Sequence, residues 1–480
     1  DLSGADLTGA DLSKVVFQGA DLSNVDLRDT NLQGADLSNV DLSGVDLTMI
    51  NFRGVDLNLL NLTGADLSNV DLSGAILSGM YSGGVDLTMI NLSGVDLSGE
   101  DFTGADLRGL VLSESDLSGA DLTGADLTGA VLRGADLRGA ILKESKLQQA
   151  NFIDVNLSGA DLRGVDFSSV DLTGVDLSGA DLRGAVLRGG IFTGAILSGS
   201  NLDDVDVKGA DLSRVDLSGV DLSGKDLRET KLERVILTES NFSDSDLTGV
   251  DLSGAIFRNS VLDNTKLDLI TADRANFSNS RISDSTFQQS VFMNSEFRNS
   301  TIVDSSLIAT IMNDSNFSGT KMNNISFLGS SLENVNFSNT KIINADLGQA
   351  NLTNANLSGS TLENTNLDRA DLRGADLTGV VLINIDLSGV DLRDSKLSGS
   401  DLGGADLTGA DLTGVDLTEL DLTNVDLQKA ILREADLTGV DLSGKNLKDG
   451  VLSGADLSGA DLSNVNLSGA DLSGADLSGA

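Results

Sequence analysis

The run that decides the fold is IFRNS at residues 256–260, which returns as NFSNS at 276–280, EFRNS at 296–300, NFSGT at 316–320 and NFSNT at 336–340. Its phenylalanines are Phe257, Phe277, Phe297, Phe317 and Phe337. An interval of twenty residues is too long for one helix face and too regular for chance. The chain is therefore predicted to return to the same place every twenty residues, with these five rings in an internal ladder.

A shorter period of five residues lies inside the period of twenty and covers the whole chain. The 480 residues divide into 96 uninterrupted pentapeptides, and the second residue of each is apolar with clear exceptions only at Ser82 and Ala272. Such repetition indicates a stack of small units, none of which buries its apolar face alone.

The spacing of five matches neither the three-and-four pattern of a helix nor the alternation of a strand. The chain must therefore bend at every unit, with the central Leu or Phe and the small residue two positions before it pointing inward. Four units then make one four-sided coil. About 24 coils, at about 4.8 Å each, would give a rod of about 115 Å.

The units Ala5-Asp6-Leu7-Thr8-Gly9 and Ala460-Asp461-Leu462-Ser463-Asn464 resemble the pentapeptide-repeat family, whose consensus is Ala, then Asp or Asn, then Leu, then two variable residues. The resemblance extends over the whole chain in unbroken phase. It implies an all-β fold, a right-handed four-sided parallel β-helix with Leu or Phe as the central inward residue. We expect residues 1–480 to form a single solenoid.

Composition divides this solenoid into three zones. Residues 1–255 and 361–480 are acidic and close to consensus, whereas residues 256–360 are rich in Phe, Ser and Asn. The net charge is −41 for the whole chain but only −3 for residues 261–350. The near-neutral zone is interpreted either as a partner site or as an older, diverged block between recently duplicated ones.

The composition excludes most catalytic chemistry. The chain has no His or Cys, so metal sites built on these residues, His-based acid–base catalysis and Ser–His triads are impossible. We predict no catalytic residue, no cofactor and no confident metal site, and we do not expect an enzyme. Direct binding of nucleic acid is not expected either, since Lys and Arg are scattered instead of forming a basic face. No run of residues is long and apolar enough for a membrane span.

An acidic ladder is predicted on one side of the solenoid, because the period of twenty places one Asp of each coil in line, about 4.8 Å apart. Its members are Asp6, Asp26, Asp46, Asp66, Asp86, Asp106 and Asp126. Four interpretations stay open: backbone hydrogen bonds at each bend together with solubility, binding of Ca²⁺ or other hard cations, imitation of duplex DNA, and recognition of an ordered surface by flat faces. Some members of the family bind DNA gyrase as DNA mimics. This chain is longer than they are and lacks their interrupting loops and terminal helix.

Three outward apolar residues, Met49, Leu59 and Met89, form a candidate apolar patch, or else a corner with local repacking. Neither end of the chain resembles a cap, and bare strand edges invite pairing. We therefore expect end-to-end self-association unless flanking sequence covers the ends. We also expect the chain to be an excerpt of a longer, bacterial protein, with an unknown protein partner and compartment.

Charged residues occupy the small inward position at Glu100, Lys225 and Lys445. An unpaired charge buried there would be costly, so each side chain is expected to turn outward through a local bulge. Taken together, the sequence predicts a rigid, acidic, non-catalytic rod that acts as a spacer, stalk or scaffold. The alternatives are a DNA-mimicking modulator of DNA gyrase or another topoisomerase, and a filament bridged by cations.

Overall fold

The computed structural model describes residues 1–42, 45–47, 50, 52, 55 and 92–480. These residues contain strands, bridges and turns but no helix. Contacts group the chain into two compact units: Asp1–Asp221 with Glu229–Ile236, and Leu222–Arg228 with Leu237–Ala480. Each unit is a stack of coils. A single solenoid over 1–480 and a total of about 24 coils stay predictions.

Each coil pairs with the next through parallel bridges between residues twenty positions apart. Asp6 pairs with Asp26 in the first unit, and Asn316 pairs with Asn336 in the second. The Leu7 N–H donates to the Asp26 carbonyl and the Asp26 N–H to the Ala5 carbonyl, both at 2.9 Å. The predicted all-β, parallel solenoid of stacked coils is therefore confirmed.

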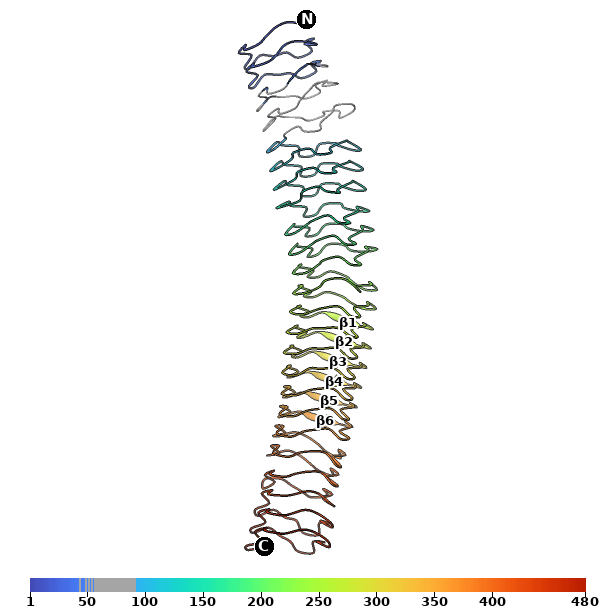
Figure 1. The fold of residues 1–480 in the computed structure, drawn as a ribbon, viewed down its shortest axis with the longest axis vertical. Helices are drawn as coiled ribbons and strands as arrows, with labels where there is room; N and C mark the ends of the chain where they lie inside the picture. The colour runs from blue at the N-terminus through green and yellow to red at the C-terminus, as the bar shows by residue number, and fades with distance from the viewer. Residues whose placement is uncertain (43–44, 48–49, 51, 53–54, 56–91) are drawn as a thin grey trace. The chain divides into compact units, whose positions relative to one another are not determined.

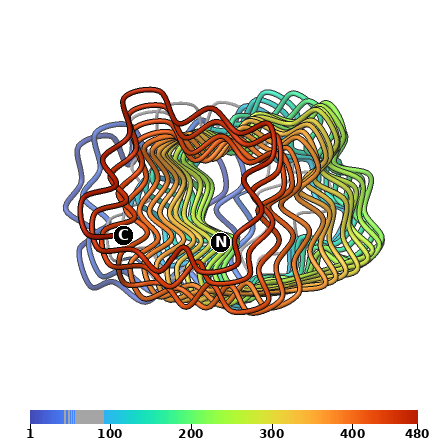
Figure 2. The same cartoon turned by 90° about the horizontal axis from the view of Figure 1, so that it is seen from below.

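The longest strands of the described chain lie on one face of the second unit, where they form a six-stranded parallel sheet in sequence order (Figure 1). They are β1 Val261–Asp263, β2 Arg281–Ser283, β3 Thr301–Val303, β4 Lys321–Asn323, β5 Lys341–Ile343 and β6 Thr361–Glu363. The register is in phase throughout, so that Thr301 pairs with Lys321 and Lys321 with Lys341. Seen along the stack in Figure 2, the yellow and orange coils of this unit follow nearly the same path.

Most bends are four-residue turns. The Ala5 N–H donates to the Leu2 carbonyl at 3.0 Å, and Gly4 between them has a φ of 68°. This left-handed conformation is costly for most residues and free for glycine, which explains the Gly at the end of so many units. Elsewhere the position is often Asn, as at Asn279 with a φ of 61°.

The interior is filled by the central residues and the small residues before them. In the near-neutral zone the five phenylalanines of the predicted ladder are buried, with exposures of 0%. Ring centroids are 4.6 Å apart for Phe257 and Phe277, 4.9 Å for Phe277 and Phe297, 4.5 Å for Phe297 and Phe317, and 5.1 Å for Phe317 and Phe337. The first three pairs are stacked within 9° of parallel.

Buried hydroxyls link successive coils in the same zone. The Ser290 hydroxyl donates to the Leu267 carbonyl at 2.7 Å and accepts the Ile270 N–H at 3.1 Å. The same donation to the carbonyl 23 residues earlier is made by Ser260, Thr265, Ser280, Ser285, Ser295, Ser300, Ser315, Thr320, Ser330 and Thr340. Ser and Thr at the inward position therefore have a structural role that Ala and Val cannot fill.

The bulges expected at Glu100, Lys225 and Lys445 are absent, so this prediction was wrong. The residue 21 positions later donates its N–H to each of their carbonyls at 2.9 Å, as at ordinary corners. All three residues are half-buried. The Lys445 ammonium donates to the Val425 carbonyl at 3.1 Å, and partial burial lowers the pKa of Lys445. A corner thus accommodates a long charged side chain without breaking the backbone ladder.

Candidate interaction surfaces

Where an outward Asp precedes the central residue, its side chain hydrogen-bonds to the bend that follows. Its Oδ1 accepts the N–H of the residue two positions on, at 3.0 Å for Asp6 and Thr8 and at 3.0 Å for Asp376 and Thr378. Side-chain and backbone hydrogen bonds from Thr8 lower the pKa of Asp6. This Asx pattern replaces a backbone acceptor at the bend. The acidic columns are thus built into the fold as well as displayed on it.

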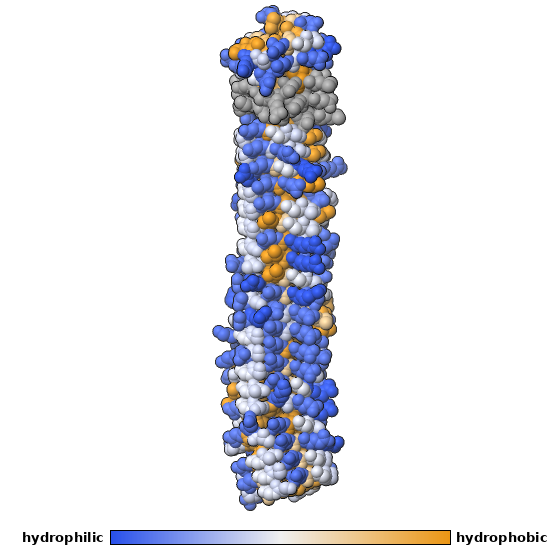
Figure 3. Space-filling view, turned by 90° about the vertical axis from the view of Figure 1, so that its left-hand side faces the viewer, coloured by the Kyte–Doolittle hydropathy of each residue, from blue (hydrophilic) through white to orange (hydrophobic). Residues whose placement is uncertain are grey.

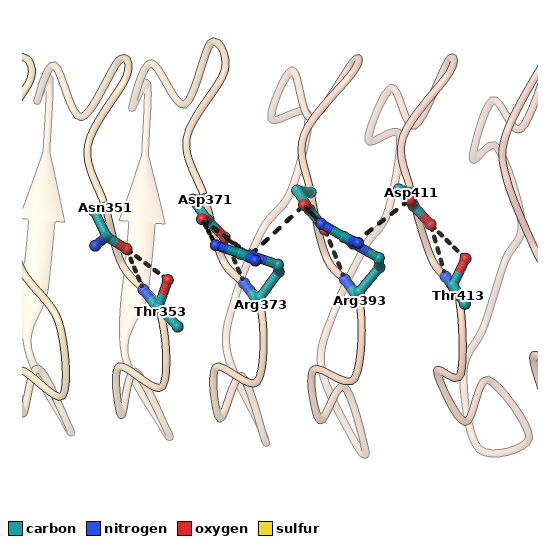
Figure 4. Close-up of polar contacts among 8 residues, drawn as sticks. Asn351, Thr353, Asp371, Arg373, Arg393, Asp411 and Thr413 are labelled. Atoms are coloured by element: carbon teal, nitrogen blue, oxygen red, sulfur yellow. Dashed lines mark hydrogen bonds and ion pairs between the residues drawn. The ribbon is translucent and has the colours of Figure 1, made fainter.

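Arg residues extend some of these bends into ion-pair ladders that run from coil to coil (Figure 4). The Arg373 guanidinium lies 2.6 Å from the Asp371 carboxylate on its own coil and 3.7 Å from Asp391 on the next. Arg393 repeats the arrangement, at 2.5 Å from Asp391 and 3.6 Å from Asp411. The hydrogen bond from Arg393, together with its charge, lowers the pKa of Asp391. The sequence signal is Asp-Leu-Arg repeated after twenty residues, which sequence reasoning did not use.

The predicted acidic ladder is only partly within the described residues. Asp6 pairs with Asp26, and Asp106 with Asp126, while Asp46 is exposed. Asp66 and Asp86 lie outside the described residues. The Arg28 side chain hydrogen-bonds to Asp26 and lowers its pKa to about 2. The column then changes character, because Lys146 follows Asp126 and lies 3.3 Å from its carboxylate.

No three acidic residues converge as a cation-binding set in the described part of the chain. None of its residues forms a helix that could cross a membrane.

Apolar side chains on the surface are dispersed. Figure 3 shows a mostly hydrophilic face on which hydrophobic residues form separate small patches. Among the described residues, the most exposed large apolar side chains are those of Val16, Leu269 and Ile153. The candidate patch of Met49, Leu59 and Met89 lies outside the described residues and stays a prediction.

The β1–β6 face differs from the acidic columns because it carries two lysines that form no ion pair among the described residues. Four lysines elsewhere at the bridge position lie beside an Asp of the preceding coil: Lys146 beside Asp126 at 3.3 Å, Lys231 beside Asp211 at 3.0 Å, Lys266 beside Asp246 at 3.8 Å and Lys396 beside Asp376 at 3.8 Å. On β4 and β5, Lys321 follows Thr301 and Lys341 follows Lys321. Sequence reasoning missed this pair, although adding twenty to each residue number places both on one column.

A shallow polar groove runs along the corner beside this face. Its lining includes Asp304, Ser306, Asn324, Asn344 and Asn364. The Asn324 side chain donates to Asp304 at 2.7 Å, and the Asn364 side chain donates to Asn344 at 3.1 Å. The Asn344 side chain donates to Asn323 at 3.1 Å. These amides therefore bond to polar side chains of neighbouring coils, so the groove has a structural explanation.

The period, the parallel bridges and the buried central residues define a β-helical repeat protein. The sequence also matches the model of the family described as Pentapeptide repeats, over residues 1–79, 86–189, 192–224, 226–264, 310–444 and 446–479. The chain therefore belongs to the pentapeptide-repeat family, whose fold is the right-handed quadrilateral β-helix. Members of this family are generally structural or interaction modules and not enzymes. The longest unmatched segment, 265–309, lies in the near-neutral zone where hydroxyls and Phe replace the consensus residues.

Solved structures similar to this chain include pentapeptide-repeat proteins. HetL, involved in regulation of heterocyst differentiation in the cyanobacterium Nostoc sp. strain PCC 7120, is 22% identical, with 66% of this chain and 90% of HetL covered and a TM-score of 0.11. QnrB1, a plasmid-mediated fluoroquinolone resistance protein, is 22% identical over 49% of this chain and 91% of its own, with a TM-score of 0.19. A thylakoid-lumen protein of Arabidopsis thaliana is 29% identical over 29% of this chain and 74% of its own, with a TM-score of 0.10. No curated protein matches the chain.

Proposed function

We propose that this chain is a non-catalytic interaction module whose stacked coils act as a rigid spacer, stalk or scaffold. The observation that supports this function is the coil-to-coil register: in the described ranges every pentapeptide keeps its phase, and bridges recur at twenty residues. A side chain at a given position of the coil therefore advances by about 4.8 Å per coil along its unit. Such a surface presents binding groups at fixed separations.

The rigidity that a spacer needs can be measured by pulsed electron paramagnetic resonance. The chain has no cysteine, so pairs of cysteines can be introduced and spin-labelled without interference. Ser278 and Thr378 lie on one column of the second unit, five coils apart, and Ser278 and Ser458 lie nine coils apart. We expect separations that differ by about 19 Å, each with a narrow distribution. Broad or overlapping distributions would rule out a rigid spacer.

A DNA-mimicking modulator of DNA gyrase is the second candidate, and the acidic columns support it. Bend-bonded carboxylates such as Asp401, Asp421 and Asp441 recur on one column of the second unit without an Arg two positions on. A supercoiling assay with gyrase tests this candidate. Mimicry would be supported if the unmodified chain inhibits or protects gyrase at micromolar concentration and a variant with Asn at these three positions does not. No effect of the unmodified chain would exclude mimicry.

A filament bridged by cations is a lesser alternative, since carboxylate oxygens suit hard cations such as Ca²⁺. Thermal melting and light scattering with Ca²⁺ and with a chelator test it. Scattering that rises with Ca²⁺ and reverses with chelator would support it, and identical melting and scattering in both would exclude it.

A further inference from the structure

The bridge-position column that contains β3 to β6 continues into the later coils of the same unit, and its chemistry changes along the stack. It reads Thr301, Lys321, Lys341, Thr361, Val381, Asp401, Asp421, Asp441 and Asp461. One half is basic or neutral, the middle is apolar, and the other half is acidic. The order is self-complementary about Val381: Lys341 and Asp421 lie two coils on either side of it, and Lys321 and Asp441 lie three coils away.

We propose that this column is the docking face for a second copy of the chain, with the two stacks antiparallel and a two-fold axis beside Val381. A two-fold axis parallel to the strand direction reverses the stack while keeping each bridge position opposite a bridge position. Lys321 of one copy then faces Asp441 of the other, and Lys341 faces Asp421. Because the contact is isologous, each ion pair forms twice.

The two lysines supply the first reason for this partner. Lys321 and Lys341 are exposed on neighbouring strands, about 4.8 Å apart. Neither forms an ion pair among the described residues, whereas the other four bridge-position lysines lie within 4.0 Å of an Asp. Two like charges this close repel each other. An acidic column from another chain, with the same coil spacing, would neutralise both at once.

The acidic half supplies the second reason. Asp401, Asp421, Asp441 and Asp461 are exposed, and each uses Oδ1 to accept the N–H two positions on, at 2.8–3.0 Å. These bonds hold the carboxylates in one row. Lys445, at the adjacent corner, interacts with Asp421 and Asp441, so the row keeps a negative but reduced charge. The basic half also contains one acidic residue, Glu363. In the proposed contact it lies opposite Gly403 of the other copy.

The middle of the face is apolar. Ile383, two residues after Val381, is 47% exposed, and Val381 is half-buried. In the proposed contact each of these residues meets its own copy, so two apolar side chains from each chain leave water together. An apolar centre flanked by polar and charged pairs is the usual anatomy of a protein interface.

The expected dimer is weak. The nine coils of the face extend about 40 Å and a three-residue side is about 10 Å wide. The contact would then cover about 400 Å² per copy, about half of a standard interface. At physiological salt the screening length is about 8 Å, so distant acidic coils contribute little repulsion. We therefore expect association in the high micromolar range. It does not depend on the proposed function, since a spacer can be a monomer.

Cysteine cross-linking of the full chain tests the geometry. Ile383→Cys places a single thiol beside the proposed axis, and Ile311→Cys, exposed on another column, is the matched control. Under mild oxidation at 200 µM we expect at least fivefold more covalent dimer from Ile383→Cys than from Ile311→Cys. Equal cross-linking at both positions, or none at Ile383→Cys, would overturn the proposal. End-to-end stacking would cross-link neither.

Charge reversal in the Ile383→Cys background tests the pairing. K321E with K341E is expected to reduce the cross-linked dimer at least fivefold, whereas K266E, on another column, leaves it unchanged. T423K and S443K add positive charge beside Asp421 and Asp441 without removing the bend-bonded carboxylates. Adding these two changes to the K321E/K341E chain should restore the dimer. The proposal would be overturned if charge reversal leaves the amount of cross-linked dimer unchanged, or if the two added lysines do not restore it. Melting curves show that each variant is folded.

Discussion

At the scale of the single residue, the hydroxyl of Ser290 replaces the carbonyl oxygen that accepts the hydrogen bond of an ordinary turn. At Ala5 the N–H at the end of the bend donates to the carbonyl three residues earlier, but the corresponding N–H of Ile270 donates to Ser290 on the next coil. This bend of the near-neutral zone is therefore closed by a side chain of the next coil. Ser145 lies at an equivalent inward position, yet its buried hydroxyl has no partner and its own N–H makes the ordinary turn bond to Leu142 at 3.0 Å.

These two serines give a matched pair of substitutions. Ser290→Ala leaves the buried Ile270 N–H and Leu267 carbonyl without this partner, and we expect a loss of about 1–3 kcal/mol in the free energy of unfolding. Ser145→Ala removes a buried polar group that makes no bond, and we expect no loss or a gain of about 1 kcal/mol. Denaturant unfolding of both variants measures the difference. Equal effects would mean that the hydroxyl bonds contribute nothing.

The bend-bonded carboxylates predict a direction for the pH dependence of stability. The pKa of Asp26 is lowered to about 2, chiefly by hydrogen bonds from Arg28, and that of Asp391 is lowered by Arg393. An Asp whose pKa is lower in the folded chain stabilises it above the unfolded pKa of about 3.9, and this contribution is lost as the pH falls through the folded value. We therefore expect the thermal midpoint to fall between about pH 4 and about pH 2.

Relief of repulsion within a chain of net charge −41 acts in the opposite direction. We expect the bend bonds to dominate, because they are short and recur throughout the described acidic zones, while charges on neighbouring coils are farther apart and screened. A thermal midpoint that rises on acidification would contradict this. Asp391→Asn is the control, since Asn351 already makes the same bend bond on this column, and its melting should depend less on pH.

At the scale of the coil, the stacked phenylalanines decide how the near-neutral zone holds together. Phe297 lies between Phe277 and Phe317, with centroid distances of 4.9 Å and 4.5 Å, and is fully buried. We expect Phe297→Ala to lower the free energy of unfolding by about 3–5 kcal/mol, through lost burial and the cavity left behind. Phe297→Leu restores the consensus residue and should cost clearly less. Chemical denaturation measures both. An almost unchanged free energy of unfolding for Phe297→Ala would show that the ring is not part of the core.

Much of the coil could be predicted from the sequence because its period appears directly in the residue numbers. Phe257 and Phe277 differ by twenty, and that interval, together with the period of five, led to the prediction of stacked coils, whose bridges are parallel as the family resemblance implied. The hydroxyl links could not be predicted, because the sequence does not distinguish a hydrogen-bonded serine such as Ser290 from a serine without a partner such as Ser145. The bulge at Lys445 was a wrong prediction because the sequence does not show how much room a corner has.

At the scale of the whole molecule, the sequence predicted the charge of each zone and one acidic column, but not which charged side chains pair. The sequence predicted two acidic zones around a near-neutral one, but the charges are also sorted by column, and a column is followed by adding twenty to a residue number. Whether Asp391 faces solvent or an Arg of the preceding coil depends on side-chain geometry that no spacing provides. Lys321 and Lys341 could have been placed on one face from their numbers, but their lack of an ion pair among the described residues became evident only by comparison with the paired lysines.

The central claim is that twenty residues make one coil with a fixed rise, so that length can be removed in whole coils. Deleting residues 401–420 removes one coil in phase, whereas deleting 401–402 moves every later central residue off the inward position. Spin labels at Ser278 and Ser458 report the outcome. The account predicts that the first deletion shortens their separation by about 5 Å with a distribution as narrow as before, and that the two-residue deletion broadens it. An unchanged separation after the removal of a whole coil, or a distribution as broad as that of the two-residue deletion, would contradict the account.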